Sequence, residues 1–327
     1  MRVLVTGSSG HLGEALVRTL RGRGDDVVGI DVTPSPSTTV VGSITDAGTV
    51  REAVAGAEAV LHPATRHKPH VATHGRQDFV DVNVTGTLTL LEAAVDAGVG
   101  AFVLTSTTST FGRAMTPPAG APAAWITEDT VPQPRNIYGA TKLAAEHVAE
   151  VVHQRDGLPV LVLRTSRFFP EPDDRADVRA AFEDENVKAN ELLHRRVDIA
   201  DVVSAHLRAL ERAASIGFGR YVVSATTPFA AADLRELGVD PARVVARHYP
   251  DQPELYAAGG WRLPEAIDRV YSNERARRDL GWNPEYGFEQ VLESLRSGSD
   301  WRSALTHAVG VKGYHRDAFP DGLYPVE

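Results

Sequence analysis

The 327-residue sequence contains no cysteine. The chain therefore has no disulfide bond, no thiolate metal ligand and no thiol nucleophile, so its acid and base chemistry must use other side chains. It also has no apolar run long enough to span a bilayer, and no charged leader followed by an apolar core and a cleavage site. We therefore expect a cytoplasmic protein that does not insert into a membrane.

Positively charged residues are in the minority. The chain has 34 Lys and Arg against 43 Asp and Glu, which gives a formal net charge of −9 at pH 7. Proteins that bind nucleic acids or acidic membranes neutralise phosphates with clustered Lys and Arg. The composition therefore argues against both kinds of partner and favours a small-molecule substrate.

A glycine-rich stretch, RVLVTGSSGHLG, opens the chain at residues 2–13. An apolar run at residues 3–5 predicts a buried strand, and the three glycines that follow have the spacing of a dinucleotide-binding turn that opens a helix. Unpaired N–H groups at the start of such a helix favour a bound pyrophosphate. The residues predicted to hold the dinucleotide here are Gly7, Ser9, Gly10, His11, Leu12 and Gly13.

Asp31 ends a second predicted strand, over residues 27–30. An acidic residue at this point of a βαβ unit accepts hydrogen bonds from the adenosine ribose hydroxyls. Its carboxylate repels a 2′-phosphate, and no Arg or Lys occurs between Asp31 and Ser43, so the sequence favours NAD over NADP. The alternative is that Asp31 is only a polar strand end.

Strands and helices continue to alternate along the chain. This alternation predicts a Rossmann-type, doubly wound parallel α/β sheet with a smaller C-terminal substrate-binding region. We assign residues 1–164 to the NAD-binding domain and residues 165–327 mainly to substrate binding, with crossover segments that return to the core. Further strands are expected over residues 59–61, 102–104 and 221–223, and long helices over residues 77–98 and 136–156. The aromatic residues of the tail, residues 313–327, are expected to wrap the fold or line the pocket.

A loop with several histidines follows the third predicted strand. The spacing of His67, His70 and His74 would gather metal ligands on a helix, but Pro69 breaks that helix and no carboxylate lies among them, so we predict no metal. Ligands of open α/β sheets bind beyond the carboxyl ends of the strands. We therefore predict that His67, Lys68 and His70 touch the substrate, the alternative being a solvated polar loop.

Tyr138 and Lys142 are four residues apart on the helix that is predicted to begin near Asn136. Side chains at this spacing project from the same helix face. A free phenol titrates near ~10, and a neighbouring ammonium lowers that value because it favours phenolate. The pair predicts a tyrosine that exchanges a proton near neutral pH, close to the hydroxyl-rich run at residues 105–112.

Together these motifs resemble the extended short-chain dehydrogenase/reductase family, in its NAD-dependent epimerase/dehydratase branch. The matching stretches are TGSSGHLG, Asp31, NVTGT at residues 83–87, STTSTFG at residues 106–112, YGATK, and RVDIADVV at residues 196–203. The resemblance implies a catalytic hydroxyl at Thr107 and a cofactor contact from Asn83. It further implies that Tyr138 donates or accepts the proton, while Lys142 holds the nicotinamide ribose and lowers the pKa of Tyr138. Family members commonly pair through the two long helices, so a homodimer is expected.

Departures from the family pattern narrow the expected activity. Family dehydratases carry Thr-Asp-Glu where this chain has Thr107, Thr108 and Ser109, so the acid and base that eliminate water are missing. Sugar-nucleotide enzymes of the family tend to carry an Asn where this chain has Arg167. Ser43 stands where many members place an Asp against adenine. The missing acid and base argue against a sugar-nucleotide dehydratase, whereas Ser43 weakens one adenine contact without changing the prediction of NAD.

Arginines in the second half of the chain, from Thr165 onward, are candidates to hold the substrate. Arg167 and Arg196 are predicted to clamp a carboxylate or phosphate of the substrate, because a guanidinium binds such groups at two points. Thr108 is a further predicted substrate contact. The alternative is a set of ion pairs with nearby carboxylates at Glu171, Asp173, Asp174 and Glu183. We predict an NAD-dependent oxidoreductase that transfers a hydride at a secondary alcohol or ketone carbon of a sugar-like or polyhydroxyl substrate. A nucleotide-sugar epimerase with tightly bound NAD is the close alternative, and a non-catalytic NAD-sensing regulator is a third.

Overall fold

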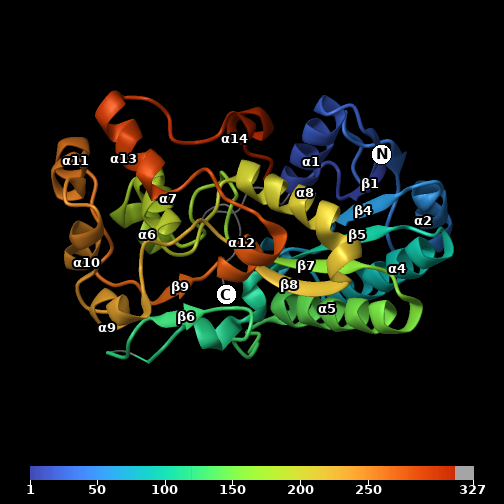
Figure 1. Ribbon diagram of the computed structural model, residues 1–327, viewed down its shortest axis with the longest axis horizontal. Helices are drawn as coiled ribbons and strands as arrows, with labels where there is room; N and C mark the ends of the chain where they lie inside the picture. The colour runs from blue at the N-terminus through green and yellow to red at the C-terminus, as the bar shows by residue number, and fades with distance from the viewer. Residues whose placement is uncertain (119, 314–327) are drawn as a thin grey trace.

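The computed structural model describes residues 1–118 and 120–313, and its core is a parallel seven-stranded sheet (Figure 1). The strand order is β3-β2-β1-β4-β5-β7-β8, so the chain changes direction across the sheet between β1 and β4. This order is the doubly wound, Rossmann-type arrangement that the sequence predicts. The strands are β1 Arg2–Thr6, β2 Asp26–Asp31, β3 Val40–Val41, β4 Ala59–His62, β5 Ala101–Thr107, β7 Val160–Thr165 and β8 Phe218–Val223.

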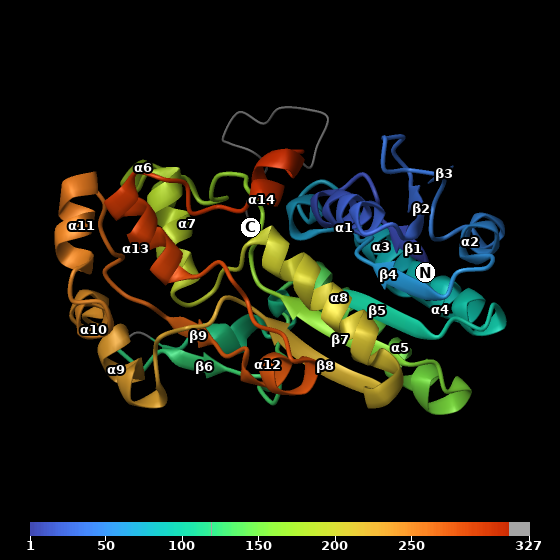
Figure 2. The same ribbon diagram turned by 45° about the horizontal axis from the view of Figure 1, so that its top comes forward.

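Helices cover both faces of this sheet. One face carries α1 His11–Gly22, α8 Ile199–Ile216, α12 Glu274–Leu280 and α14 Ala304–Val309, and the other carries α2 Ala47–Val54, α4 Gly86–Asp96 and α5 Ile137–Asp156. In Figure 2, α8 lies across β5 and β7, which it contacts. Because both faces are covered, the strands are apolar on both sides, and Val3, Leu4 and Val5 are all fully buried.

The predicted long helix over residues 77–98 is present as three segments in direct succession. They are α3 Arg76–Val80, a π-helical turn η2 Asp81–Thr85, and α4. A π turn inserts an extra residue and rotates the side chains that follow it. Apolar periodicity predicts the extent of this helical stretch but not the turn within it.

The smaller part of the molecule lies beside the carboxyl ends of the strands, at the left in Figure 1, around an apolar cluster of its own. It contains α6 Ala176–Ala181, α7 Asp184–Leu192, α9 Leu234–Leu237, α10 Pro241–His248, α11 Gln252–Gly259, α13 Phe288–Ser297 and a second sheet of β6 Ala124–Ile126 and β9 Arg269–Tyr271. The chain therefore passes between the two parts more than once: β6 leaves the large sheet for the smaller part, and α8 and β8 return to the large sheet. The sequence pattern does not indicate the β6 and β9 pairing.

Four short 3-10 helices complete the described elements: η1 Lys68–His70, η3 Thr108–Thr110, η4 Gly112–Met115 and η5 Ala231–Asp233. Among residues 1–118 and 120–313, none of the helices combines the length and apolar character needed to cross a bilayer. Residues 314–327, which hold the aromatic side chains of the predicted tail, lie outside the described part of the chain.

Candidate active site

The turn between β1 and α1 forms a cradle at the start of a helix. Gly7 has φ of +60°, in the left-handed region that favours glycine, and its carbonyl accepts a hydrogen bond of 3.0 Å from Gly10 N–H. A Cβ at Gly13 would lie 1.9 Å from the Gly7 carbonyl oxygen, so α1 approaches the strand closely only because residue 13 is glycine. Helix α1 begins at His11, as the glycine spacing predicts.

Asp31 fastens this turn to the end of β2. Its Oδ2 accepts a hydrogen bond of 3.0 Å from Ser9 N–H, and its Oδ1 accepts one of 2.8 Å from Thr33 N–H. A carboxylate has about four acceptor positions, so two more are available for hydroxyl donors. A glycine cradle at a helix N-terminus, with a carboxylate at the neighbouring strand end, fits the pyrophosphate and adenosine ribose of a dinucleotide.

The three residues predicted to be catalytic lie at the carboxyl end of β5 and in the first turns of α5. Asn136 caps α5 by accepting a hydrogen bond of 3.1 Å from Gly139 N–H. The hydroxyl of Thr107, which ends β5, lies close enough to the Tyr138 phenol to oppose the rise of its pKa. Lys142 follows Tyr138 by one helical turn, and all three side chains are buried. The structure therefore brings the hydroxyl, the phenol and the ammonium to one place.

The acidity of Tyr138 differs from the sequence-based expectation. Burial raises the pKa of the Tyr138 phenol, and the nearby Thr107 hydroxyl opposes that rise only in part. Burial also lowers the pKa of Lys142 to about 8, against the opposing attraction of Glu146. The expected lowering of the Tyr138 pKa is therefore wrong for this structure, because removal from water penalises phenolate more than the neighbouring groups stabilise it.

Glu146 belongs to this site, although the sequence analysis missed it. It lies one turn beyond Lys142 on α5 and is fully buried. Its carboxylate accepts hydrogen bonds of 2.5 Å from Ser106 Oγ and 2.7 Å from Arg164 Nη2, and one of 3.2 Å from Arg220 Nε. The spacing that connects Tyr138 to Lys142 also connects Lys142 to Glu146, and that repeat was the available signal.

His67 lies against Tyr138, the predicted catalytic tyrosine. Its ring centroid is 5.0 Å from that of Tyr138 and 4.9 Å from that of Phe169, and Phe169 in turn lies 5.3 Å from the His11 ring. Burial and the nearby charges of His70, His11 and Lys68 hold the pKa of His67 well below its usual value. A neutral imidazole therefore borders Tyr138 at neutral pH.

The other predicted residues of the loop after β4 support its shape. His70 Nδ1 accepts a hydrogen bond of 3.0 Å from the His67 backbone N–H, and Lys68 Nζ lies 2.5 Å from Asp174 Oδ2. Thr108, another predicted substrate contact, is buried next to Thr107 at the start of η3. Of these residues, the structure places Thr108 beside Thr107, whose hydroxyl is predicted to be catalytic, and Lys68 in an ion pair.

Asn83 lies in the π turn and holds the loop after β4 against α5. Its Oδ1 accepts hydrogen bonds of 2.7 Å from Arg66 N–H and 2.8 Å from Thr65 Oγ1. Its Nδ2 donates to the Arg66 carbonyl at 3.1 Å and to Thr141 Oγ1 at 3.0 Å. These bonds give Asn83 a positioning role next to Lys142, and its contact with the cofactor stays a prediction.

The two predicted substrate-binding arginines are engaged by carboxylates. Arg167 Nη1 lies 2.7 Å from Asp173 and 3.6 Å from both Asp174 and Glu191. Arg196 Nη1 lies 2.8 Å from Glu191. The ion-pair alternative is therefore the arrangement present in the structure, and a substrate contact from either guanidinium stays a prediction.

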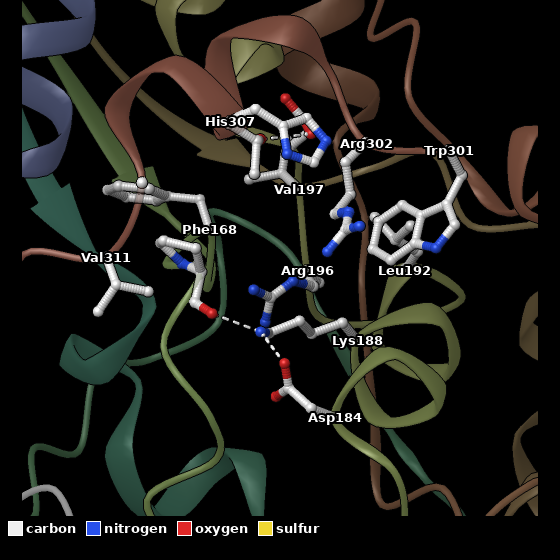
Figure 3. Close-up of a pocket in the computed structure, with 14 residues that line it drawn as sticks. Phe168, Asp184, Lys188, Leu192, Arg196, Val197, Trp301, Arg302, His307 and Val311 are labelled. Atoms are coloured by element: carbon white, nitrogen blue, oxygen red, sulfur yellow. Dashed lines mark hydrogen bonds and ion pairs between the residues drawn. The ribbon is translucent and has the colours of Figure 1, made fainter. Parts of the chain in front are cut away.

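A cavity of about 230 Å³ lies between α7 and the segment around α14 (Figure 3). Its wall includes Phe168, Arg196 and Trp301, and Lys188 extends along it to the Pro170 carbonyl, 2.5 Å away, and to Asp184. The Phe168 ring lies 4.3 Å from that of Phe169, which contacts His67. The phenylalanine pair therefore stands between this cavity and the Tyr138 site.

The fold and the site together define a dinucleotide-binding enzyme of the oxidoreductase type. A sequence model of the NAD dependent epimerase/dehydratase family matches residues 3–224, which is most of the chain. The chain belongs to this family, whose extended short-chain dehydrogenase/reductase fold it has, and its cofactor is NAD.

Individual relatives span most of the chain. It is 30% identical over 334 residues to a 3-beta-hydroxysteroid dehydrogenase of Mycolicibacterium neoaurum, with 89% of each chain covered. It is 26% identical over 345 residues to a UDP-glucose 4-epimerase of Streptomyces lividans, covering 96% of this chain and 98% of that protein. A short-chain dehydrogenase/reductase superfamily protein from Agrobacterium tumefaciens, solved with bound NAD, superposes with a TM-score of 0.63 at 26% identity and covers 91% of this chain and 96% of the other. Two more relatives, from Sinorhizobium fredii and Haloferax volcanii, match along only 39% and 57% of their own lengths.

Proposed function

We propose that the protein is an NAD-dependent dehydrogenase or reductase that acts on a secondary alcohol or ketone carbon of a sugar-like or other polyhydroxyl substrate. The buried Thr107 hydroxyl beside the Tyr138 phenol, one turn before the buried Lys142, is the observation that carries this proposal. A phenol and a hydroxyl aimed at one point can hold the oxygen of a reacting carbinol or carbonyl. The relative named 3-beta-hydroxysteroid dehydrogenase supports net redox chemistry.

Each residue has a defined part in the reaction. NAD, held by the glycine turn and Asp31, supplies the hydride acceptor or, when reduced, the hydride donor. In the reductive direction Tyr138 donates its proton to the oxygen that becomes the hydroxyl, and in the oxidative direction the phenolate takes that proton back. Thr107 hydrogen-bonds the same oxygen, and the Lys142 ammonium stabilises phenolate. Because burial raises the pKa of Tyr138, the group is a proton donor at neutral pH in the state described.

Tyr138→Phe tests this proposal. The variant removes the proton-transferring oxygen and keeps the ring, so we expect turnover to fall by about 10²-fold or more while NAD binds as in the wild type. Calorimetry measures NAD binding, and NADH absorbance measures turnover with sugars, sugar acids and alcohols. A non-catalytic NAD sensor would show no turnover before the substitution and no change in NAD binding after it. That result would refute the proposal.

An epimerase is the second candidate, because the UDP-glucose 4-epimerase of Streptomyces lividans aligns with nearly the whole chain. An epimerase retains its NAD and returns the hydride to the opposite face of the substrate. It therefore yields an altered stereocentre without free NADH, whereas a dehydrogenase yields free NADH. Mass spectrometry of small molecules that copurify with the protein distinguishes retained NAD and a nucleotide sugar from an empty enzyme.

A homodimer through α4 and α5 is part of the proposal. These helices pack against each other on one face of the sheet, and Val151 of α5 is 51% exposed. Light scattering of the purified protein measures the mass directly, and a monomer at micromolar concentration would contradict this assembly.

A further inference from the structure

An acidic loop, defined here as residues 171–174, crosses the side of the site where His67 lies. Each of its three carboxylates pairs with a cationic or titratable group from a different segment. Glu171 lies 2.6 Å from His11 at the start of α1, Asp173 lies 2.7 Å from Arg167 after β7, and Asp174 lies 2.5 Å from Lys68 after β4. The acidic loop therefore binds to three segments that surround Tyr138 and the coenzyme cradle.

Glu191 of α7 adds a fourth carboxylate from the opposite side. It lies 2.8 Å from both Arg195 and Arg196 and 3.6 Å from Arg167. The four carboxylates are buried, each no more than 8% exposed. Three of them lie against permanent cations: Asp173 against Arg167, Asp174 against Lys68, and Glu191 against Arg195 and Arg196, which share it. Each of these four cations therefore contacts a buried carboxylate.

Two carboxylates of this cluster, Asp174 and Glu191, stay ionised at neutral pH. Burial alone would raise the pKa of Asp174, but Lys68 and Arg167 bring it to about 2. Burial is likewise outweighed at Glu191, where Arg167, Arg195 and Arg196 hold the pKa well below its usual value. An anionic substrate group that bound one of these guanidiniums would compete for it with a buried carboxylate, which is unfavourable because the carboxylate would lose part of its compensating charge.

The cations that line the neighbouring cavity are likewise in contact with carboxylates. Lys188 pairs with Asp184, Arg196 pairs with Glu191, and Arg302 lies 2.8 Å from Asp300 (Figure 3 shows the three cations). A phosphate that entered this cavity would also have to displace a carboxylate. His67, in contrast, is neutral and adds no charge beside Tyr138.

We propose that the substrate which reacts at Tyr138 is uncharged, a polyol, sugar or other alcohol without phosphate, and that Asp173, Asp174 and Glu191 exclude anionic substrates by neutralising the nearby guanidiniums. The inference rests on the oxidoreductase function proposed above and specifies its substrate class. It separates the protein from enzymes that hold a nucleoside diphosphate, since such a ligand needs cations that are not already paired.

Uridine diphosphate is a suitable probe, titrated by calorimetry into the protein saturated with NAD. We expect the wild type to bind it with a dissociation constant above ~1 mM. Asp173→Asn leaves Arg167 with less compensating charge, so we expect uridine diphosphate to bind at least tenfold more tightly. Asp177→Asn is the matched control, because Asp177 is exposed, pairs with Arg175 and removes the same charge without touching Arg167.

Two results would overturn the inference: micromolar binding of uridine diphosphate by the wild type, or equal binding by the Asp173→Asn and Asp177→Asn proteins. Glu191→Gln is tested in parallel by the same tenfold criterion and decides the matter if Asp173→Asn does not fold by circular dichroism. The proposed function fails separately, if the wild type does not bind NAD or does not reduce it with any alcohol. Tight binding of uridine diphosphate alongside NADH formation would reject only the substrate class.

Discussion

Replacement of Glu146 by Gln tests the buried charge network that surrounds Lys142. Glu146 is fully buried and accepts hydrogen bonds from Ser106, Arg164 and Arg220. Glutamine keeps the shape but removes the charge, so Arg164, which is 2% exposed, loses its buried counter-charge. Breaking a buried pair from one side costs roughly 3–5 kcal/mol, and we take the lower end, about 3 kcal/mol, because glutamine keeps one acceptor oxygen.

The loss is measurable as a lower melting temperature. For a chain of 327 residues, about 3 kcal/mol corresponds to a decrease of about 4 °C in the melting temperature. Differential scanning calorimetry measures this shift, and urea unfolding gives the free energy directly. Glu150→Gln is the control one turn further on, because Glu150 also pairs with Arg220, at 2.8 Å, but is partly exposed. We expect that variant to lose less than about 1 kcal/mol.

The same substitution reports on catalysis through pH. Glu146 raises the pKa of Lys142, which burial brings down to about 8. Without Glu146 that pKa falls further, so the ammonium is lost at a lower pH. We expect the alkaline limb of kcat/KM to move to lower pH in the Gln variant and to stay in place in the Glu150 control. An unchanged melting temperature together with an unchanged pH profile would refute the reasoning.

Three further predictions follow from single groups. Gly13→Ala should abolish NAD binding, as measured by calorimetry, because the new Cβ would lie 1.9 Å from the Gly7 carbonyl oxygen. Gly22→Ala is the control in the same helix, where a Cβ meets open space. This control should raise the free energy of unfolding, as measured in urea, by about 0.5–1 kcal/mol. Asp31→Asn should weaken NAD binding and reduce the preference for NAD over NADP, as measured by titration with both coenzymes. Burial lowers the pKa of His206 to about 4 in the folded protein. As the pH falls, this histidine is therefore protonated in the unfolded chain before it is protonated in the folded one. The stability that the neutral imidazole confers is lost between about pH 6.5 and pH 4. That loss is about 3 kcal/mol, and His206→Gln should flatten the pH dependence of urea unfolding over the same range.

The parts of the site that local patterns specify were predictable from the sequence. The glycine spacing predicts the turn before α1, and the four-residue spacing of Tyr138 and Lys142 predicts their common face, because each pattern acts within one turn or one helix. The order of strands and helices predicts the parallel sheet by the same kind of reasoning. Glu146 was also within reach, since it repeats that helical spacing.

Contacts between distant segments were not predictable in this way. Lys68 pairs with Asp174 across 106 positions of sequence, and the charges of the two residues do not identify them as partners among 77 charged Lys, Arg, Asp and Glu side chains. The β6 and β9 pair joins residues that are even further apart in the sequence, such as Ala124 and Arg269. The pKa of Tyr138 depends on burial, which the spacing from Lys142 does not report. Sequence patterns therefore identify the reacting groups better than their electrostatic environment.

The two buried charge networks of the site have different consequences for the reaction. Glu146 is shared by Arg164 and Arg220 as well as attracting Lys142, so it does not neutralise the lysine by itself. Arg167 contacts Asp173, and Arg195 and Arg196 share Glu191. Positive charge is thus available one turn from Tyr138, where we propose that phenolate forms, whereas the guanidiniums of the second network are already in contact with carboxylates. Such a distribution suits an enzyme whose new negative charge develops on the tyrosine and on the reacting oxygen, and whose substrate carries none of its own.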